Sequence, residues 1–96
     1  MIQIFLSDKP NKRFVAVYNN KKYYFGQPNA NTYIDGASQT TRENYLKRHI
    51  ANPVERLRIE QLIPSPALFS AYILWGQTQD INKNTEILEK MLINEL

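Results

Sequence analysis

The chain has 96 residues, a formal net charge of +3 and no cysteine. Its length fits one domain, 1–96, and the lack of cysteine excludes disulfides, zinc–thiolate centres and thiol nucleophiles. Hydrophobic residues make up 43% of the chain, enough for a modest core. No signal-peptide pattern follows Met1, and the longest apolar run, 71–75, is far too short to span a bilayer. We therefore expect a single intracellular domain without membrane contact.

Three segments of the N-terminal part, 1–26, are rich in β-branched and aromatic residues, which favour strands. In chain order these segments are 2–6, 13–18 and 21–25. Asn19 and Asn20 tolerate positive φ and can form a two-residue turn between the second and third strands. Gly26 then ends the third strand. The pattern predicts an antiparallel β-hairpin or a three-stranded sheet.

A loop and a helical region follow the strands. Residues 27–39 combine Gly, Pro, Asn and Asp and predict an irregular loop, with a short extended piece at 32–34. Thr40 and Glu43 have capping-box spacing, which predicts that a helix begins at Thr40 and starts the helical region 40–76.

Three helices are expected in this region, and proline marks two of their starts. Pro53 and Pro66 suit the first helical position, Ser65 suits the N-cap before Pro66, and Gly76 suits a left-handed C-cap. The expected helices are 40–50, 53–62 and 66–75.

The last segment, 77–96, predicts an amphipathic helix from about Thr85 to Leu96 that docks on the body or on a partner. Its apolar residues at helical spacing are the candidate partner-binding residues: Ile87, Leu88, Met91 and Leu92. The expected fold class is α+β, a small antiparallel hairpin or three-stranded sheet packed against three to four helices.

Positive charge is concentrated in the first part of the chain. Residues 1–58 hold ten of the twelve Lys and Arg but only four of the nine Asp and Glu. With the tyrosines of the hairpin, these cations can neutralise phosphates and stack on bases. The candidate nucleic-acid-binding residues are Lys12, Arg13, Lys21, Lys22, Arg42, Lys47 and Arg48. The alternative is that the tyrosines pack against helices and the lysines protect strand edges from pairing.

Catalytic and metal chemistry have weaker support in the sequence. His49 is the single histidine and falls on the inner stripe of a helix, which favours a core residue with a hydrogen-bond partner over a metal ligand. Ser70, His49 and Asp35 could form a Ser–His–acid set, but no nucleophile-elbow or phosphate-loop motif accompanies them. We therefore predict no enzyme activity, no metal and no cofactor.

The ordered set of motifs resembles a family of small proteins encoded by large double-stranded DNA viruses, among them giant algal and amoebal viruses and large phages. That family has a basic hairpin ending in Phe-Gly, a loop with Asp, a helix with Tyr and Arg-His, and a Ser-containing helix ending in Leu-Trp. The matching residues here are Lys12–Tyr18, Lys21–Gly26, Tyr33, Asp35, Arg42, Tyr45, Arg48, His49, Ser65, Ser70, Leu74 and Trp75. The loop 27–31 departs from the pattern. The resemblance implies a viral origin without a known enzymatic activity.

Two functions from different classes remain open on these grounds. The first is a non-enzymatic virion or assembly protein, structural or adaptor, acting through a protein partner or self-association. The second is a viral nucleic-acid-binding accessory protein that uses the basic hairpin and the first helix. An inhibitor of a host defence protein is a further alternative. The expected location is the virion or the host cytoplasm.

Overall fold

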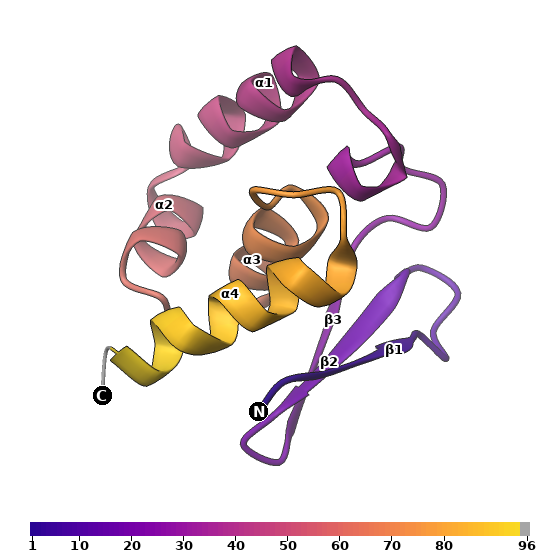
Figure 1. The fold of residues 1–96 in the computed structure, drawn as a ribbon, viewed down its shortest axis with the longest axis vertical. Coiled ribbons are helices and arrows are strands. Elements are labelled where there is room, and N and C mark those ends of the chain that lie inside the picture. Colours follow the sequence, from indigo (N-terminus) through magenta and orange to yellow (C-terminus); the bar gives the residue numbers. More distant parts are fainter. Residues whose placement is uncertain (95–96) are drawn as a thin grey trace.

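A computed structural model describes residues 1–94, with side chains through residue 93. These residues form a three-stranded antiparallel sheet in the order β1–β2–β3 and four α-helices (Figure 1). The remaining elements of the described residues are a 3-10 turn, η1, and a π-helical turn, η2. The elements are β1 Gln3–Leu6, β2 Phe14–Tyr18, β3 Lys21–Phe25, η1 Tyr33–Asp35, α1 Gln39–Ile50, α2 Pro53–Glu60, α3 Pro66–Phe69, η2 Ser70–Leu74 and α4 Ile81–Asn94. The predicted α+β class is confirmed.

The hairpin of β2 and β3 forms as the sequence predicts. Asn19 and Asn20 have φ of 51° and 64°, the left-handed values that a two-residue hairpin turn requires. The resulting register sets Val15 opposite Tyr24. Because side chains alternate along a strand, this register turns Phe25 inward, where it is fully buried.

The helices lie to one side of the sheet (Figure 1). The inner face of the sheet contributes Phe14, Ala16 and Phe25 to the core. Phe69 of α3 packs on this face, with its ring centroid 5.2 Å from that of Tyr23 and 5.9 Å from that of Phe25. Aromatic contacts therefore join α3 to the sheet and fix one wall of the cavity described below.

The start of α1 differs from the prediction by two residues. Ser38, and not Thr40, is the N-cap, and its Oγ accepts a hydrogen bond of 3.1 Å from the backbone N–H of Thr41. Both residues can cap a helix, so the sequence alone did not decide between them. The predicted extended piece at 32–34 is also wrong, because Tyr33–Asp35 form the turn η1.

The predicted helix 66–75 is divided between α3 and η2. Ser65 caps α3 as expected, and its Oγ accepts from the N–H of Leu68. Gly76 is not a left-handed cap, because its φ is not positive. It is required for a different reason: a Cβ there would lie 2.2 Å from the carbonyl oxygen of Tyr72 and 2.7 Å from Cγ of Asn84.

Helix α4 docks on the body of its own chain. It begins at Ile81, earlier than predicted, because Asp80 accepts from the N–H of Asn82 and caps the helix. Leu88 and Leu92 are 0% and 6% exposed and belong to the core. These two candidate partner-binding residues therefore offer no free surface.

The other two candidates on α4, Ile87 and Met91, remain half-buried. The predicted extension of this helix to Leu96 falls on residues outside those described. Among residues 1–94, none of the helices combines the length and apolar character needed to cross a membrane.

Candidate anion-binding site

A cavity of about 690 Å³, called the basic cavity below, opens between the loop after β3 and the helices α1, α2 and α3. Its wall includes three cationic side chains from three separate segments: Lys12 before β2, Arg48 on α1 and Arg58 on α2. All three residues are exposed. Phe25 and Trp75 also line it, but both are buried and offer almost no accessible surface. The accessible apolar part of the lining comes from residues such as Pro66 and Ala67, so cationic and apolar groups share the wall, as in many ligand sites.

Helix α1 supplies three side chains to the wall from a single face. Tyr45, Arg48 and His49 are spaced i, i+3 and i+4, which places them together on a helix. The Tyr45 ring stacks on Trp75 at 4.3 Å between centroids and 11° between planes, and it lies 4.0 Å from the His49 ring. This stack fixes α1 against the end of η2 and thereby holds Arg48 in the wall of the cavity.

The His49 imidazole is oriented by a carboxylate. Its Nδ1 donates to Oε2 of Glu55, which stands in the first turn of α2. An ionised carboxylate can only accept, so Nδ1 carries the hydrogen and Nε2 is left for a further partner. Asn52 caps α2 by accepting from the N–H groups of Val54 and Glu55, which places Glu55 beside the end of α1.

Tyr45 remains protonated well into the alkaline range. Burial raises the pKa of Tyr45 to about 12, the neighbouring Ser70 hydroxyl opposes this shift, and the Glu55 carboxylate adds to it. Ser70 also lines the cavity. The wall therefore carries a neutral phenol and a hydroxyl beside the three cations, all of them groups that can donate hydrogen bonds.

Gly26 allows the loop to leave the sheet over the cavity. Its φ is +85°, and a Cβ there would lie 3.0 Å from Cδ1 of Leu74. The N–H of Arg13 donates to the carbonyl of Gly26 at 3.0 Å, which ties the loop to the segment before β2. This link places Lys12 next to the same cavity.

The seven predicted nucleic-acid-binding residues do not gather on one surface. Lys12 and Arg48 line the basic cavity, as the sequence could not foresee. Lys21 and Lys22 are exposed at the opposite end of β3, and Lys47 is exposed on α1.

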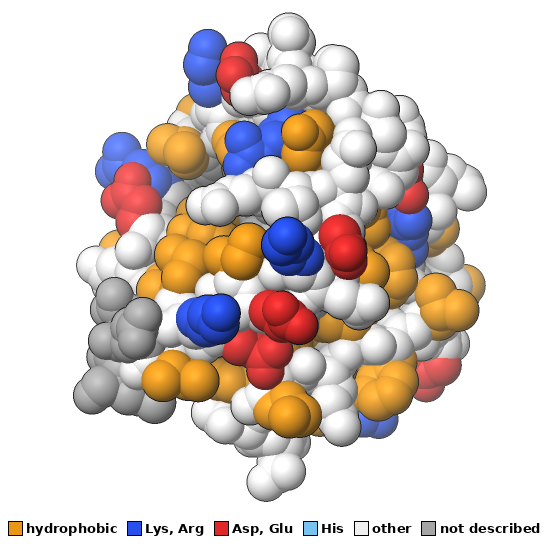
Figure 2. Space-filling view, in the orientation of Figure 1, with side chains coloured by type: hydrophobic (Ala, Val, Ile, Leu, Met, Phe, Trp, Pro, Cys, Tyr) orange, Lys and Arg blue, Asp and Glu red, His pale blue; other side chains and the backbone are white. Residues whose placement is uncertain are grey.

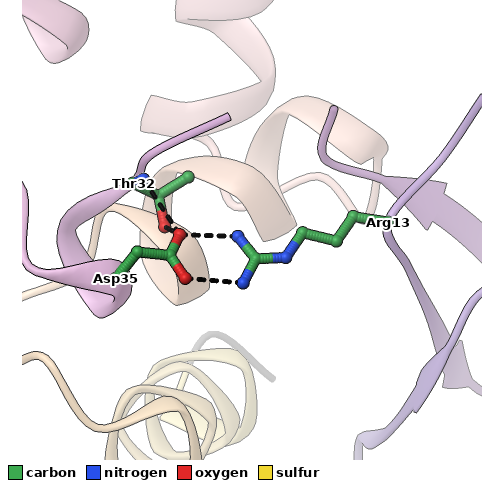
Figure 3. A network of polar contacts seen from close by, with 3 residues as sticks. All are labelled: Arg13, Thr32 and Asp35. Carbon is green, nitrogen blue, oxygen red and sulfur yellow. Dashed lines mark hydrogen bonds and ion pairs between the residues drawn. The ribbon is translucent and has the colours of Figure 1, made fainter. Parts of the chain in front are cut away.

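Two of these seven predicted residues, Arg42 and Arg13, form hydrogen bonds to other parts of the chain. Arg42 donates from Nε to the carbonyl oxygens of Trp75 and Gly76, at 3.0 and 2.8 Å. Arg13 makes two hydrogen bonds of 2.6 Å to the carboxylate of Asp35 (Figure 3). Both side chains therefore position loops around the cavity instead of facing it.

The acid of the hypothetical Ser–His–acid set is likewise engaged elsewhere. Asp35 accepts from the N–H and the hydroxyl of Thr32, in addition to its bonds with Arg13 (Figure 3). The residue that holds His49 is Glu55. Within residues 1–94, no three His, Asp or Glu side chains are close enough together to hold a metal ion.

The Arg13–Asp35 pair predicts a stability difference that depends on pH. The Arg13 guanidinium and the Thr32 bonds hold the pKa of Asp35 well below its usual range. At neutral pH, Asp35→Asn should lower the free energy of unfolding by about 1 kcal/mol, because the pair is only partly buried. The contribution of a carboxyl with a lowered pKa is complete above its unfolded value of about 3.9 and is lost as the pH falls below that. Urea unfolding of both proteins should show a difference in unfolding free energy at neutral pH that vanishes at strongly acidic pH. A difference of the same size at both pH values would contradict the assignment.

A second concavity lies on the other side of α1. This apolar groove, about 220 Å³, runs between α1 and α4 and is lined by Leu46, Ile50, Ile59, Tyr72 and Ile87, among others. Figure 2 shows hydrophobic side chains gathered between α4 and the arm formed by α1 and α2. Ile87, one of the four candidate partner-binding residues of α4, lines this groove.

Sequence reasoning missed Arg58 and Glu55 as site residues. Their i, i+3 spacing on α2 sets them on one side of that helix, which is a detectable signal. The signal does not say which side meets α1, because that depends on the turn at Asn52 and Pro53. Arg58 therefore looked like ordinary surface charge.

Fold and site together define a small α+β domain with a basic cavity between its sheet and its first three helices. The chain belongs to the family described as Family of unknown function (DUF5754), whose sequence profile matches residues 2–49. The matched stretch covers the sheet and most of α1, including Lys12, Arg48 and His49.

One relative supports the resemblance to viral proteins. Uncharacterized protein L851 of Acanthamoeba polyphaga mimivirus is 38% identical over 80 residues, which cover 77% of this chain and 80% of that protein. This match confirms the resemblance at the level of a giant-virus protein. No solved structure matches the chain.

Proposed function

We propose that this chain is a non-catalytic nucleic-acid-binding accessory protein of giant viruses, which holds a phosphate of its ligand in the basic cavity. The observation that supports this proposal is the convergence of Lys12, Arg48 and Arg58 from three separate segments. Like charges repel, so cations brought to one concave surface without an equal number of carboxylates favour an anionic ligand. The net charge of +3 favours the same kind of partner at long range.

The neutral groups of the wall suit a phosphate as well. Among the residues that the structure describes, Glu55 is the one carboxylate in the wall, and it is engaged by His49. The Ser70 hydroxyl and the Arg48 and Arg58 guanidinium groups can donate to phosphate oxygens, and guanidinium groups do so with two parallel bonds. These features suit a binding site, and we propose no catalytic turnover there.

A salt titration tests this function. A fluorescently labelled single-stranded oligonucleotide should bind at low ionic strength, and its affinity should fall roughly tenfold between about 50 and 200 mM salt, as expected for two or three phosphate contacts. Absence of binding at low salt, or an affinity that does not depend on salt, would reject the proposal. Chemical change of the oligonucleotide during the titration would reject its non-catalytic part.

A virion-associated adaptor protein is the second candidate, and the apolar groove favours it. Ile50 lines this groove and is 42% exposed, and Val54 and Leu57 on α2 are exposed as well. An apolar groove with exposed apolar side chains on the neighbouring helix is typical of a protein contact. If this function holds, the chain should be found in purified particles by mass spectrometry, and Ile50→Ser should reduce its incorporation. A chain that is monomeric in solution and absent from particles would exclude it.

A further inference from the structure

We infer that the basic cavity takes one nucleoside monophosphate unit, either a free mononucleotide or the 5′-phosphorylated end of a strand. This inference rests on the proposed function and specifies its ligand. A phosphate monoester at the end of a strand differs from the internal diesters in charge and in the number of free oxygens. The charge of the cavity wall favours the monoester.

The charge of the wall matches a monoester better than a diester. Lys12, Arg48 and Arg58 face one carboxylate, Glu55, which leaves an excess of two positive charges when His49 is neutral. A phosphate monoester carries a charge of about −1.5 to −2 at neutral pH, because its second pKa lies near 6. An internal phosphodiester carries a single negative charge, so it would leave part of the positive excess of the wall uncompensated.

The shape of the cavity suits one nucleotide unit. Its volume of about 690 Å³ falls within the range of small-molecule sites, about 300 to 1,000 Å³. Among its apolar lining residues, Tyr45 and Ala67 are partly exposed and Pro66 is exposed. Phe25, Leu74 and Trp75 are buried and offer a ligand almost no surface. A nucleoside can therefore contact the accessible apolar side chains while its phosphate lies among the three exposed cations.

The surroundings of the cavity favour a terminal unit over an internal one. The wall is built by the loop after β3 on one side, by α1 and α2 on another, and by α3 and η2. A continuous strand would need to enter and leave between these segments. A strand end needs to enter from one side only, and it brings its doubly charged phosphate to the wall that holds Lys12, Arg48 and Arg58.

The experiment compares four probes by competition against one labelled 5′-phosphorylated oligothymidylate at low salt. The probes are the same oligothymidylate with a 5′-phosphate, the same strand with a 5′-hydroxyl, thymidine 5′-monophosphate and inorganic phosphate. The 5′-phosphorylated strand should bind about tenfold more tightly than the 5′-hydroxyl strand. Inorganic phosphate should compete at least about tenfold less well than thymidine monophosphate, because it lacks the nucleoside that contacts the accessible apolar side chains of the wall.

The mononucleotide probe separates the two possible sources of the ligand. If thymidine monophosphate competes as well as the phosphorylated strand, the site contacts the terminal nucleotide unit alone and accepts a free nucleotide equally well. If the strand competes far better, the ligand is a strand end. Both results support the inference about the chemistry of the site.

Two variants connect the preference to the cavity. Ser70→Ala and Arg58→Gln should each reduce the ratio between the phosphorylated and hydroxyl strands, because each removes a donor from the wall. Lys22→Gln is the matched control. Lys22 is exposed near the opposite end of β3 and outside the cavity, so its replacement should leave the ratio unchanged.

Failure of the inference can be told apart from failure of the proposed function. Equal, salt-dependent binding of the two strands would overturn the inference and leave nucleic-acid binding intact. Binding of thymidine monophosphate without binding of either strand would overturn the nucleic-acid function and retain the nucleotide site. Equal competition by inorganic phosphate and thymidine monophosphate would overturn the nucleoside part.

Discussion

Replacing Asn84 by alanine should lower the free energy of unfolding by about 3 kcal/mol, a large share of the stability of a domain of this size. Asn84 is 1% exposed in the first turn of α4. Its Nδ2 donates to the carbonyl oxygens of Ile73 and Thr78, both at 2.8 Å. Its Oδ1 accepts from the N–H and the hydroxyl of Thr78, at 3.1 and 2.7 Å. Alanine would leave the buried Ile73 carbonyl without this partner and would remove the bonds to the partly buried Thr78 groups. Each buried group left unpaired costs about 1 to 3 kcal/mol.

Thermal and urea unfolding measure this effect. A loss of about 3 kcal/mol should lower the melting temperature by roughly 12 °C or more in a chain of this length. Asn82→Ala is the matched control, because Asn82 is exposed in the same helical turn. Its effect should stay within about 0.5 kcal/mol. Equal effects of the two substitutions would show that the Asn84 bonds do not join α4 to the preceding turn.

The Asn84 network shows which part of the fold the sequence predicts and which part it does not. An amphipathic helix near the C-terminus followed from apolar residues at helical spacing, a local property of the chain. Asn84 fell just before the predicted start of that helix, at about Thr85, and no role was predicted for it from the sequence. Its role depends on the carbonyl of Ile73, eleven residues earlier, and on Gly76, which leaves room for its side chain. No periodic pattern records such a contact.

The same distinction holds for the strands and the caps. Asn19 and Asn20 carry their turn geometry in their own φ preferences, so the hairpin was predictable residue by residue. At the start of α1, Ser38 and Thr40 both suit an N-cap; Ser38 caps the helix, and the residue before it, Ala37, is buried in the core. Local chemistry thus predicted the elements, whereas tertiary contacts decided some of their bounds.

The sequence predicted which types of residue would form the site, but it did not predict which individual residues would line the cavity. Lys12 and Arg48 were recognised as basic residues that can meet phosphate, and both line the cavity. Arg13 and Arg42 have the same chemistry, but they bind Asp35 and two backbone carbonyls. Only the folded arrangement distinguishes a cation that faces a cavity from one that holds a loop in place.

The pairing of His49 with Glu55 shows why the cavity could not be predicted from local sequence patterns. The two residues are six apart, a spacing that no single helix brings onto one face. They meet because α1 ends at Ile50 and α2 starts anew at Pro53, so the chain changes direction between them. That bend also carries Arg58 to the cavity, and it accounts for a cationic wall residue that charge counting alone did not identify.

Reversing two charges of the cavity should abolish most of the nucleic-acid binding. In the variant Arg48→Glu with Arg58→Glu, two donors to phosphate become two carboxylates beside Glu55. We expect affinity for a 5′-phosphorylated oligonucleotide to fall roughly 100-fold or more at low salt, because attraction and hydrogen bonds are lost and repulsion is added. In the milder variant Arg48→Gln with Arg58→Gln, the salt slope should decrease by about 1.4, the value for two lost contacts to a single strand.

The matched control for this variant is Lys21→Glu with Lys22→Glu, which changes the net charge by the same amount at the opposite end of β3. Long-range attraction depends on net charge, so both double variants should lose the same nonspecific part of the affinity. The difference between them measures what the basic cavity contributes. If the control weakens binding as much as the cavity variant does, the phosphate is held by the overall charge of the domain, and the cavity has no special role.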